Sequence, residues 1–259
     1  MNSNLTGMII DLEGKFANFK KFYSNSSSAT YYYPPRTTII GILASVLGRE
    51  KESYHEEFSM NNLKIGIAVQ NELKKQFHTI NYLLIKKSDE LNGSNENSHT
   101  QVPFEVVQAK NKNESIKYRL YLGFNSEDSS LYKELKEKLS KNFQYYPIYF
   151  GKTGFSANYK LVSKKIKFIF QNGDGNFIDL HTVIPKDILA KDSENIDFSK
   201  KYEILSEDRI TLEFKENNSR AVSLIKSYIF SNGKNIRAKV NKFYQVEVDK
   251  ITENICFME

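Results

Sequence analysis

The sequence lacks tryptophan and contains a single cysteine, Cys256. One cysteine excludes a disulfide bond within the chain and a zinc site made of several cysteines, and it fits a reducing compartment. The histidines, at positions 55, 78, 99 and 181, do not have the short spacing of metal ligands. We therefore expect a cytoplasmic protein that uses no metal or other cofactor.

Long apolar segments are also missing from the sequence. No apolar run approaches the roughly 20 residues that a membrane-spanning helix needs. The first residues, MNSNLTGMIIDLEG, lack the positive start and the long apolar centre of a secretory signal peptide. We expect a soluble protein with no membrane partner.

The chain does have a positive excess and many flat rings. Its 37 Lys and Arg against 31 Asp and Glu give a formal net charge of +6, and it has 16 tyrosines and 18 phenylalanines. A positive excess favours an acidic partner, and rings offer surfaces on which nucleic-acid bases stack. At 259 residues, the chain is long enough for one large domain or two small ones.

Residues 23–48, YSNSSSATYYYPPRTTIIGILASVLG, lead from a polar and aromatic loop through two prolines into a helix. Proline fits the last extended and first helical positions, Thr37 or Thr38 can cap the helix, and Gly48 can end it. Gly41, Ala44, Ser45 and Gly48 form a strip of small residues that would let another backbone approach closely.

The start of this helix is typical of an anion site. Free N–H groups and the positive end of the helix dipole would face the preceding loop, where Arg36 adds a permanent charge and a planar fork of donors. We predict that a phosphate binds there. The pattern also fits an ordinary core helix, because helix ends carry such residues for stability alone.

The segment 13–23, EGKFANFKKFY, alternates lysines with aromatic residues. Such a pattern suits a strand of nucleic acid, with lysines on phosphates and rings against bases. A strand with a solvated lysine face explains the pattern equally well.

A long hairpin is predicted at about residues 72–109. Strand-like runs at 77–85 and 102–107 flank the polar stretch KKSDELNGSNENSHTQ, which has too little apolar surface to pack on its own domain. We expect the tip, residues 86–103, either to move freely or to be ordered by a partner.

The order of the elements predicts an α+β fold with a ferredoxin-like (RRM-like) βαββαβ domain. The expected elements are strand 7–12, helix 36–48, strand 63–69, the hairpin insertion, strand 118–124, helix 128–141 and strand 166–170. This domain would span residues 1–170, and residues 171–259 would form a smaller β-rich lobe. NGDGN at 172–176 and SNGKN at 231–235 are hairpin-type turn signals in that lobe. Residues 50–60 are expected to form a helix or a turn.

Residues 145–156, YYPIYFGKTGFS, contain half of a phosphate-binding P-loop. The full pattern needs a glycine five residues before Gly151, and that position is Tyr146. A P-loop nucleoside triphosphatase is therefore excluded, although Lys152 and Thr153 could still contact phosphate.

Residues 22–48, FYSNSSSATYYYPPRTTIIGILASVLG, resemble the N-terminal signature of the CRISPR-associated Cas-five family, in the form found in type I-B systems, and YYPIYFGKTGFS resembles that family's Tyr-Pro-Tyr-Leu-Gly segment. The family belongs to the RAMP superfamily. The resemblance implies a non-catalytic, RNA-binding subunit of the Cascade surveillance complex, a ribonucleoprotein of antiviral defence, that binds and caps the 5′ handle of the CRISPR RNA (crRNA).

The resemblance also implies partners. The hairpin would be a thumb that reaches the Cas-seven backbone subunit, and the large Cas-eight type subunit would dock nearby. Target DNA would be recognised indirectly, by pairing with the guide. The long glycine-rich loop of the wider superfamily is missing near the C-terminus.

Site residues follow from the same resemblance. The helix entry would hold phosphates, the serine loop and its tyrosines would line the site, and lysines would follow the RNA backbone. The implied RNA-binding residues are Lys20, Lys21, Tyr23, Ser26, Ser27, Tyr33, Arg36, Thr37, Thr38, Lys110 and Lys152.

Two alternatives remain open from sequence. The first is a metal-independent endoribonuclease that processes CRISPR repeat RNA, for which Tyr54, His55 and Lys110 could supply acid, base and cation. The carboxylates next to His55, in SYHEEF, would repel phosphate. The second is an RNA-recognition protein that works outside any complex.

Overall fold

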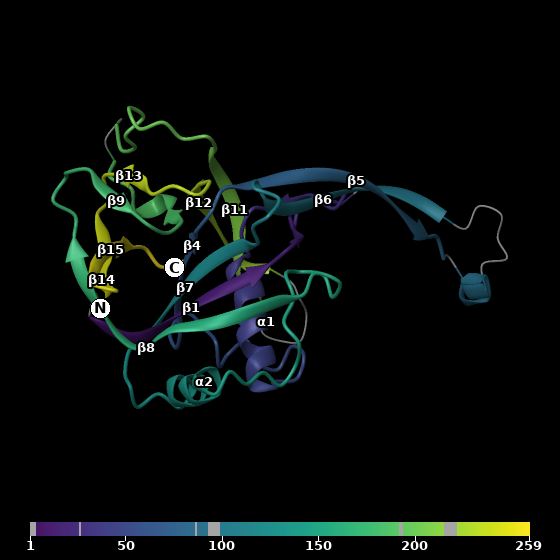
Figure 1. Ribbon diagram of the computed structural model, residues 1–259, viewed down its shortest axis with the longest axis horizontal. Helices are drawn as coiled ribbons and strands as arrows, with labels where there is room; N and C mark the ends of the chain where they lie inside the picture. The colour runs from purple at the N-terminus through teal and green to yellow at the C-terminus, as the bar shows by residue number, and fades with distance from the viewer. Residues whose placement is uncertain (1–3, 26, 86, 93–98, 192–193, 215–221) are drawn as a thin grey trace.

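The centre of the fold is a six-stranded antiparallel sheet in the order β15-β14-β8-β1-β7-β4, which curls as a half-barrel (Figure 1). This computed structural model describes residues 4–25, 27–85, 87–92, 99–191, 194–214 and 222–259. The strands are β1 (Leu5–Gly14), β4 (Lys64–Val69), β7 (Ile116–Phe124), β8 (Ala157–Asn172), β14 (Lys242–Val248) and β15 (Ile251–Ile255). The four strands predicted for the first 170 residues thus lie side by side, and the last two extend their sheet.

Strand β1 lies inside the sheet because both of its faces are apolar. Met8 and Ile10 belong to the core cluster on the side of the helices, and Ile9 belongs to the cluster on the other side. Gly7 allows close packing, because a Cβ atom there would lie 1.9 Å from the carbonyl oxygen of Leu122. A strand that is packed against other elements on both faces of its sheet carries apolar residues on both faces.

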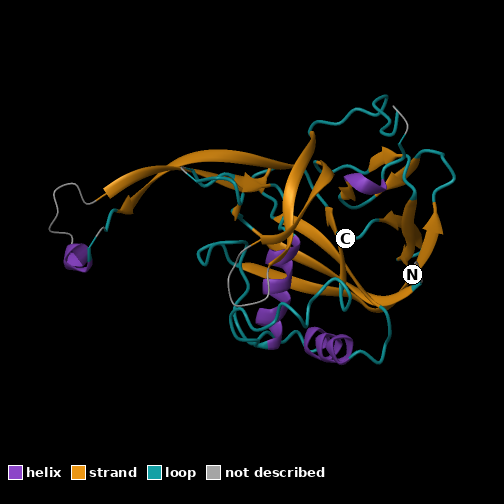
Figure 2. Cartoon of the chain, turned by 180° about the vertical axis from the view of Figure 1, so that it is seen from behind, coloured by secondary structure: helices purple, strands orange, loops and turns teal. Residues whose placement is uncertain are grey.

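Helices α1 (Arg36–Leu47) and α2 (Ser130–Ser140) cover one face of the sheet (Figure 2). Gly48 ends α1 in the left-handed conformation, with φ of 75°, as predicted. The predicted threonine cap is wrong: the N-cap position is Pro35, and no side chain caps the helix within the described residues. The Pro35 carbonyl instead accepts from the N–H groups of Thr38 and Ile39.

Strands β5 (Leu73–Leu83) and β6 (His99–Ala109) form the predicted hairpin, which projects far from the body (Figure 1). Their register runs without a break from Leu73 opposite Ala109 to Leu83 opposite His99. The 3-10 helix η1 (Ser88–Asn92) follows β5. The rest of the predicted tip, residues 86 and 93–98, lies outside the described residues.

The C-terminal part is strand-rich, as expected, and its apolar residues contribute to more than one core cluster: Leu180, Ile229 and Phe243 belong to a cluster made only of residues from this part. Its remaining elements are β9 (Ile178–Leu180), β10 (Ile184–Pro185), η2 (Lys186–Ile188), β11 (Leu205–Phe214), β12 (Val222–Ser231) and β13 (Ile236–Ala238). Ile210 and Tyr228 share the core cluster of α1. The predicted boundary at residue 170 falls inside β8, and the division into two domains stays a prediction.

The two predicted turn motifs are turns but not hairpins. Gly175 and Gly233 have φ values of 82° and 66°, which glycine adopts without strain. The first motif leads from β8 to β9 and the second from β12 to β13, and neither pair is hydrogen-bonded, because β9 pairs with β13. Residues 50–60 form turns and no helix.

The Arg36 side chain lies inside the protein, with 0% of its surface exposed. Its guanidinium donates to the carbonyl oxygens of Phe58 (2.8 Å), Leu63 (2.9 Å) and Leu212 (3.4 Å). Burial lowers the pKa of Arg36 to about 10, and Glu213 at 3.9 Å partly opposes that effect. The expected phosphate contact of Arg36 is therefore wrong, because the side chain is buried and its two terminal nitrogens hold the first turn of α1, residues 58–63 and β11 together.

Replacing Arg36 tests this structural role. Arg36→Ala leaves three buried carbonyl groups without their donor, and we expect the free energy of unfolding to fall by about 3–5 kcal/mol. Thr37 is the next residue and is half-buried, so Thr37→Ala should change the free energy of unfolding by only about 0.5 kcal/mol. Urea denaturation of both variants measures the difference, and equal midpoints would show that Arg36 does not stabilise the fold.

Candidate nucleic-acid interface

The loop between β2 (Phe19–Lys20) and β3 (Thr30–Tyr31) is fixed to the base of the hairpin. The Ser28 N–H donates to the Pro103 carbonyl (2.8 Å), and the Glu105 N–H donates to the Ser28 carbonyl (3.1 Å). The buried Asn18 amide donates to the carbonyls of Ser28 (3.1 Å) and Glu105 (2.8 Å). The loop and the hairpin base therefore form one continuous surface.

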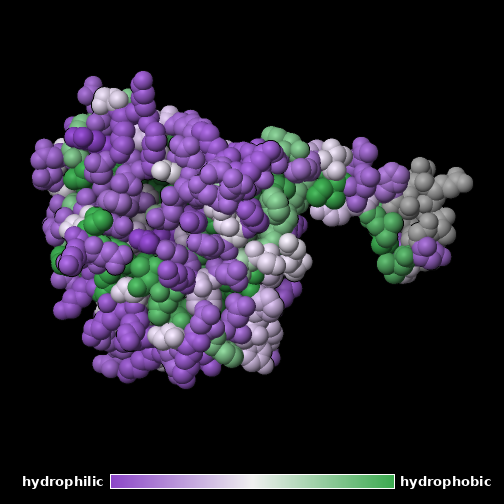
Figure 3. Space-filling model, in the orientation of Figure 1, coloured by the Kyte–Doolittle hydropathy of each residue, from purple (hydrophilic) through white to green (hydrophobic). Residues whose placement is uncertain are grey.

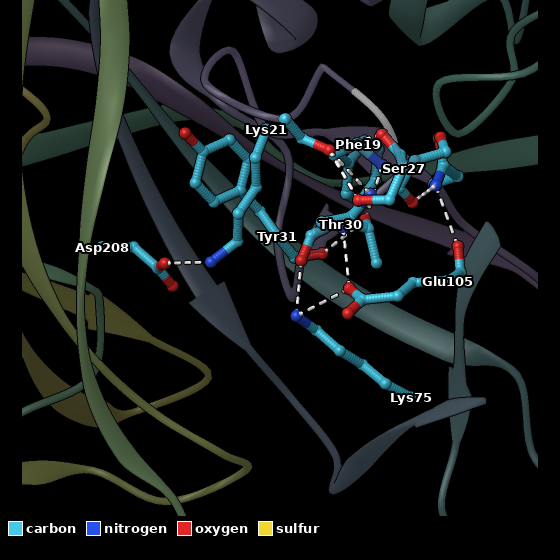
Figure 4. Close-up of polar contacts among 12 residues, drawn as sticks. Phe19, Lys21, Ser27, Thr30, Tyr31, Lys75, Glu105 and Asp208 are labelled. Carbon is cyan, nitrogen blue, oxygen red and sulfur yellow. Dashed lines mark hydrogen bonds and ion pairs between the residues drawn. The ribbon is translucent and has the colours of Figure 1, made fainter. Parts of the chain in front are cut away.

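The carboxylate of Glu105 makes a second set of bonds to this loop (Figure 4). It accepts from the Thr30 N–H at 2.8 Å and forms an ion pair with Lys75 at 3.3 Å. Burial lowers the pKa of Lys75, and Glu105 partly opposes this. Lys75 also lies 4.6 Å from the centroid of the Tyr32 ring, so its charge is used within the protein.

The structure brings four of the predicted site residues together on this loop. Lys20 and Tyr23 are exposed, and Ser27 is half-buried with its hydroxyl 3.1 Å from that of Ser24. Lys21 is held by Asp208 at 2.6 Å, close to Tyr31 (Figure 4). Its ammonium lies 5.2 Å from the centroid of the Tyr31 ring and 5.7 Å from that of the Tyr23 ring. Its charge is therefore largely balanced. Ser26 lies outside the described residues.

Tyr33 does not line the loop, and this prediction is wrong. Its side chain has 0% exposure and packs against Phe230 with 5.2 Å between ring centroids. Burial raises its pKa well above the usual value, and its hydroxyl has no hydrogen-bond partner among the described residues. The ring is a core residue.

The two predicted rim lysines differ in their surroundings. Lys110 forms ion pairs with Glu72 (3.0 Å) and Glu203 (2.7 Å), which neutralise it. Lys152 is exposed, and its ammonium lies 5.9 Å from the centroid of the Phe104 ring at the hairpin base. Lys152 is thus near the loop surface, whereas Lys110 is a poor ligand for another anion.

The second sequence motif crosses helix α1 along its small residues. The N–H groups of Tyr145 and Tyr146 donate to the carbonyls of Val46 (3.2 Å) and Ser45 (3.0 Å), which is the close backbone approach predicted for that strip. A cleft of about 600 Å³ lies between the helix and the motif, and Thr37 and Thr38 line it. Both threonines therefore remain accessible from one side.

Sequence reasoning missed two sets of residues here. Tyr145, Tyr146 and Tyr149 are all exposed beside the cleft, although only the following Lys152 and Thr153 had been singled out. Asn232 is buried and bonds both the N–H and the carbonyl of Leu73, each at 2.8 Å, which fixes the start of the hairpin. The only signal for it was the turn motif.

The alternative catalytic set is not assembled. Tyr54 and His55 line the cleft beside α1, but Lys110 is not among the lining residues and is bonded to two carboxylates at the base of the hairpin. Within the described ranges, no group of three or more His, Cys, Asp or Glu could hold a metal ion. No described helix is long and apolar enough to cross a membrane.

Asn18 provides a test of how the loop is held. Asn18→Ala leaves the Ser28 and Glu105 carbonyls without a donor, so we expect a loss of about 1–3 kcal/mol in the free energy of unfolding and faster amide exchange at Ser28 and Glu105. The exposed Asn81 of the hairpin is the control, since Asn81→Ala removes no such bonds. Unchanged exchange in Asn18→Ala would contradict the assignment.

Comparisons with known proteins identify the family. The chain matches the family model described as "CRISPR-associated protein (Cas_Cas5)" over residues 7–139. No curated protein matched. The chain is similar to the "Crystal structure of a CRISPR protein from Archaeoglobus fulgidus" (15% identity, 96% of this chain and 98% of that one, TM-score 0.56) and to a "CRISPR RNA-guided surveillance complex" chain (14%, 90% and 91%, TM-score 0.48). The first shares the fold, and by its match to the family model this chain belongs to the Cas-five family of CRISPR-associated proteins.

Proposed function

We propose that this protein is the subunit of a type I-B Cascade complex that binds and caps the 5′ handle of the crRNA. Family membership supports the general role, and the residue 22–48 signature supports the subtype. The observation that carries the proposal is the loop fixed on the hairpin base, around which Lys20, Tyr23 and Lys152 are exposed. In this proposal the βαββαβ elements are a ferredoxin-like domain, the hairpin is its thumb and residues 171–259 are an accessory lobe.

The proposed RNA site uses these exposed groups. Lys20 and Lys152 would contact phosphates, because cations along a single strand supply most of its affinity. Tyr23 offers a ring for stacking. Thr37 and Thr38, at the positive end of α1, would meet the strand where it leaves the loop, and Ser27 adds a hydroxyl donor.

The hairpin is proposed to contact the Cas-seven backbone subunit. It carries apolar side chains that its own domain does not cover: Phe77 is 74% exposed, Leu91 65% and Leu83 51%. Figure 3 shows hydrophobic residues along this arm. Such exposure on a projecting element is typical of a surface that a partner covers. The Cas-eight type subunit would dock on the body, and target DNA would be recognised by pairing with the guide.

We propose that the protein does not cut RNA. The support is that Lys110 is bonded to two carboxylates away from Tyr54 and His55. Incubating the purified chain with labelled repeat RNA, without other subunits, tests this directly. Intact RNA is expected, and site-specific cleavage would establish the endoribonuclease alternative.

Salt dependence measures the proposed phosphate contacts. Lys20→Ala and Lys152→Ala should each reduce the magnitude of the slope of log affinity against log salt by about one unit or less. The reason is that a variant with one phosphate contact fewer releases fewer counterions when it binds RNA. Lys167→Ala is the matched control, since Lys167 is exposed opposite Thr6, at the other end of β1. Filter-binding titrations with handle RNA give the slopes, and three equal slopes would contradict the site.

The hairpin contact has its own test. Phe77→Asp should not destabilise the chain, because Phe77 is largely exposed, but it should abolish co-purification with the Cas-seven subunit and guide. Ile251→Asp changes a residue of 64% exposure on β15, away from the hairpin, and should assemble normally. If both variants assemble as the wild type does, the hairpin is not the contact.

A further inference from the structure

The cleft beside α1 is a built cavity that phosphate contacts do not explain. Its volume of about 600 Å³ lies within the ~300–1,000 Å³ typical of small-ligand sites. Its lining includes Thr38, Gly41 and Ser45 of the helix and Tyr146 and Tyr149 of the tyrosine motif. A cleft lined by a helix and by a segment that carries aromatic rings suits a flat group, which can stack on those rings.

The charges of the cleft do not favour an anion. Arg49 is bound by Glu57 at 2.7 Å and Glu134 at 2.6 Å, and Lys51 lies 3.8 Å from Glu52. Glu50 adds a further negative charge to the lining. Because the cations are balanced by carboxylates, a neutral ligand fits better than a phosphate.

The two tyrosines of the lining are exposed, and the backbone of Tyr146 is fixed to the helix. Tyr146 is 46% exposed and Tyr149 is 42% exposed, while the backbone of Tyr146 is hydrogen-bonded to Ser45 at 3.0 Å. A ring on a fixed backbone offers stacking area at little entropic cost. Gly41 leaves space on the helix side of the cleft, because the nearest atom to a Cβ built there is the Tyr54 hydroxyl at 3.4 Å.

The cleft also adjoins the proposed RNA surface. Gly151 lines it, and the next residue is Lys152. A Cβ at Gly151 would lie 2.0 Å from the Asn18 carbonyl oxygen, so this end of the cleft touches the segment that carries the loop. A strand bound by Lys20 and Lys152 would therefore reach the cleft within the same protein.

We propose that this cleft holds one unstacked nucleobase of the guide RNA, stacked against the Tyr146 and Tyr149 rings and facing Gly41. Thr37 and Thr38 supply hydroxyl groups for the edge of the base. The inference rests on the proposed function and adds to it a base-binding site distinct from the phosphate contacts. Protein recognition of single-stranded RNA commonly takes bases that are splayed out and stacked on aromatic side chains.

Single abasic nucleotides placed in turn along the handle RNA locate the bound base. Wild-type protein should lose about 10-fold in affinity or more at one position, the scale of a lost stacking contact. Gly41→Leu, which fills the cleft, should bind intact RNA as weakly as the wild type binds that abasic RNA. Its salt slope should stay unchanged, because no phosphate contact is lost.

Gly154→Leu is the matched control, because a Cβ there meets nothing within 4 Å and Gly154 does not line the cleft. Circular dichroism and urea denaturation check that Gly41→Leu folds, and Tyr149→Ala, which removes an exposed ring, gives a second variant.

A flat abasic scan, with normal wild-type binding and salt slope, would overturn the base site and leave the proposed function intact. So would a Gly41→Leu variant that binds RNA normally but no longer assembles with the other subunits, since the occupant would then be protein. No handle binding by the wild type would overturn both.

Discussion

The buried guanidinium of Arg36 is the interaction on which the rest of the structure depends. It bonds carbonyls from residues 58–63 and from β11, so one side chain joins the first turn of α1 to segments about 20 and 180 residues away in sequence. A buried cation is costly unless its donors are satisfied, and here burial depresses the pKa of Arg36 to about 10. Because these carbonyls come from both parts of the chain, α1 cannot be placed without β11.

The position of α1 then sets the site. The carbonyls of Val46 and Ser45 near its C-terminal end accept from the backbone of the tyrosine segment, and that segment continues to Lys152 near the hairpin base. Asn18 and Glu105 tie the polar loop to the same base. Cleft, loop and hairpin are thus connected through the same elements, which is why we propose that a single RNA strand contacts all three.

Local patterns predicted much of this fold because their causes are local. Gly48 ends α1 since only glycine adopts that φ without strain, and alternating strands around a polar tip are enough to indicate the hairpin. The predicted roles of Tyr33 and Arg36 at the helix start were wrong because the sequence does not distinguish a buried polar or amphipathic residue from an exposed one such as Thr37. Tertiary packing buries Arg36 and Tyr33 and leaves Thr37 on the cleft.

By itself, the sequence determined the family, through a long contiguous signature, together with the helix, the hairpin and the absence of a disulfide. Only the tertiary structure decided which charges are available. Lys21 and Lys110 are balanced by Asp208, Glu72 and Glu203, which lie distant in sequence, while Lys20 and Lys152 are exposed. The reason is physical: a residue type fixes its charge, but its neighbours in space decide whether that charge is left for a ligand.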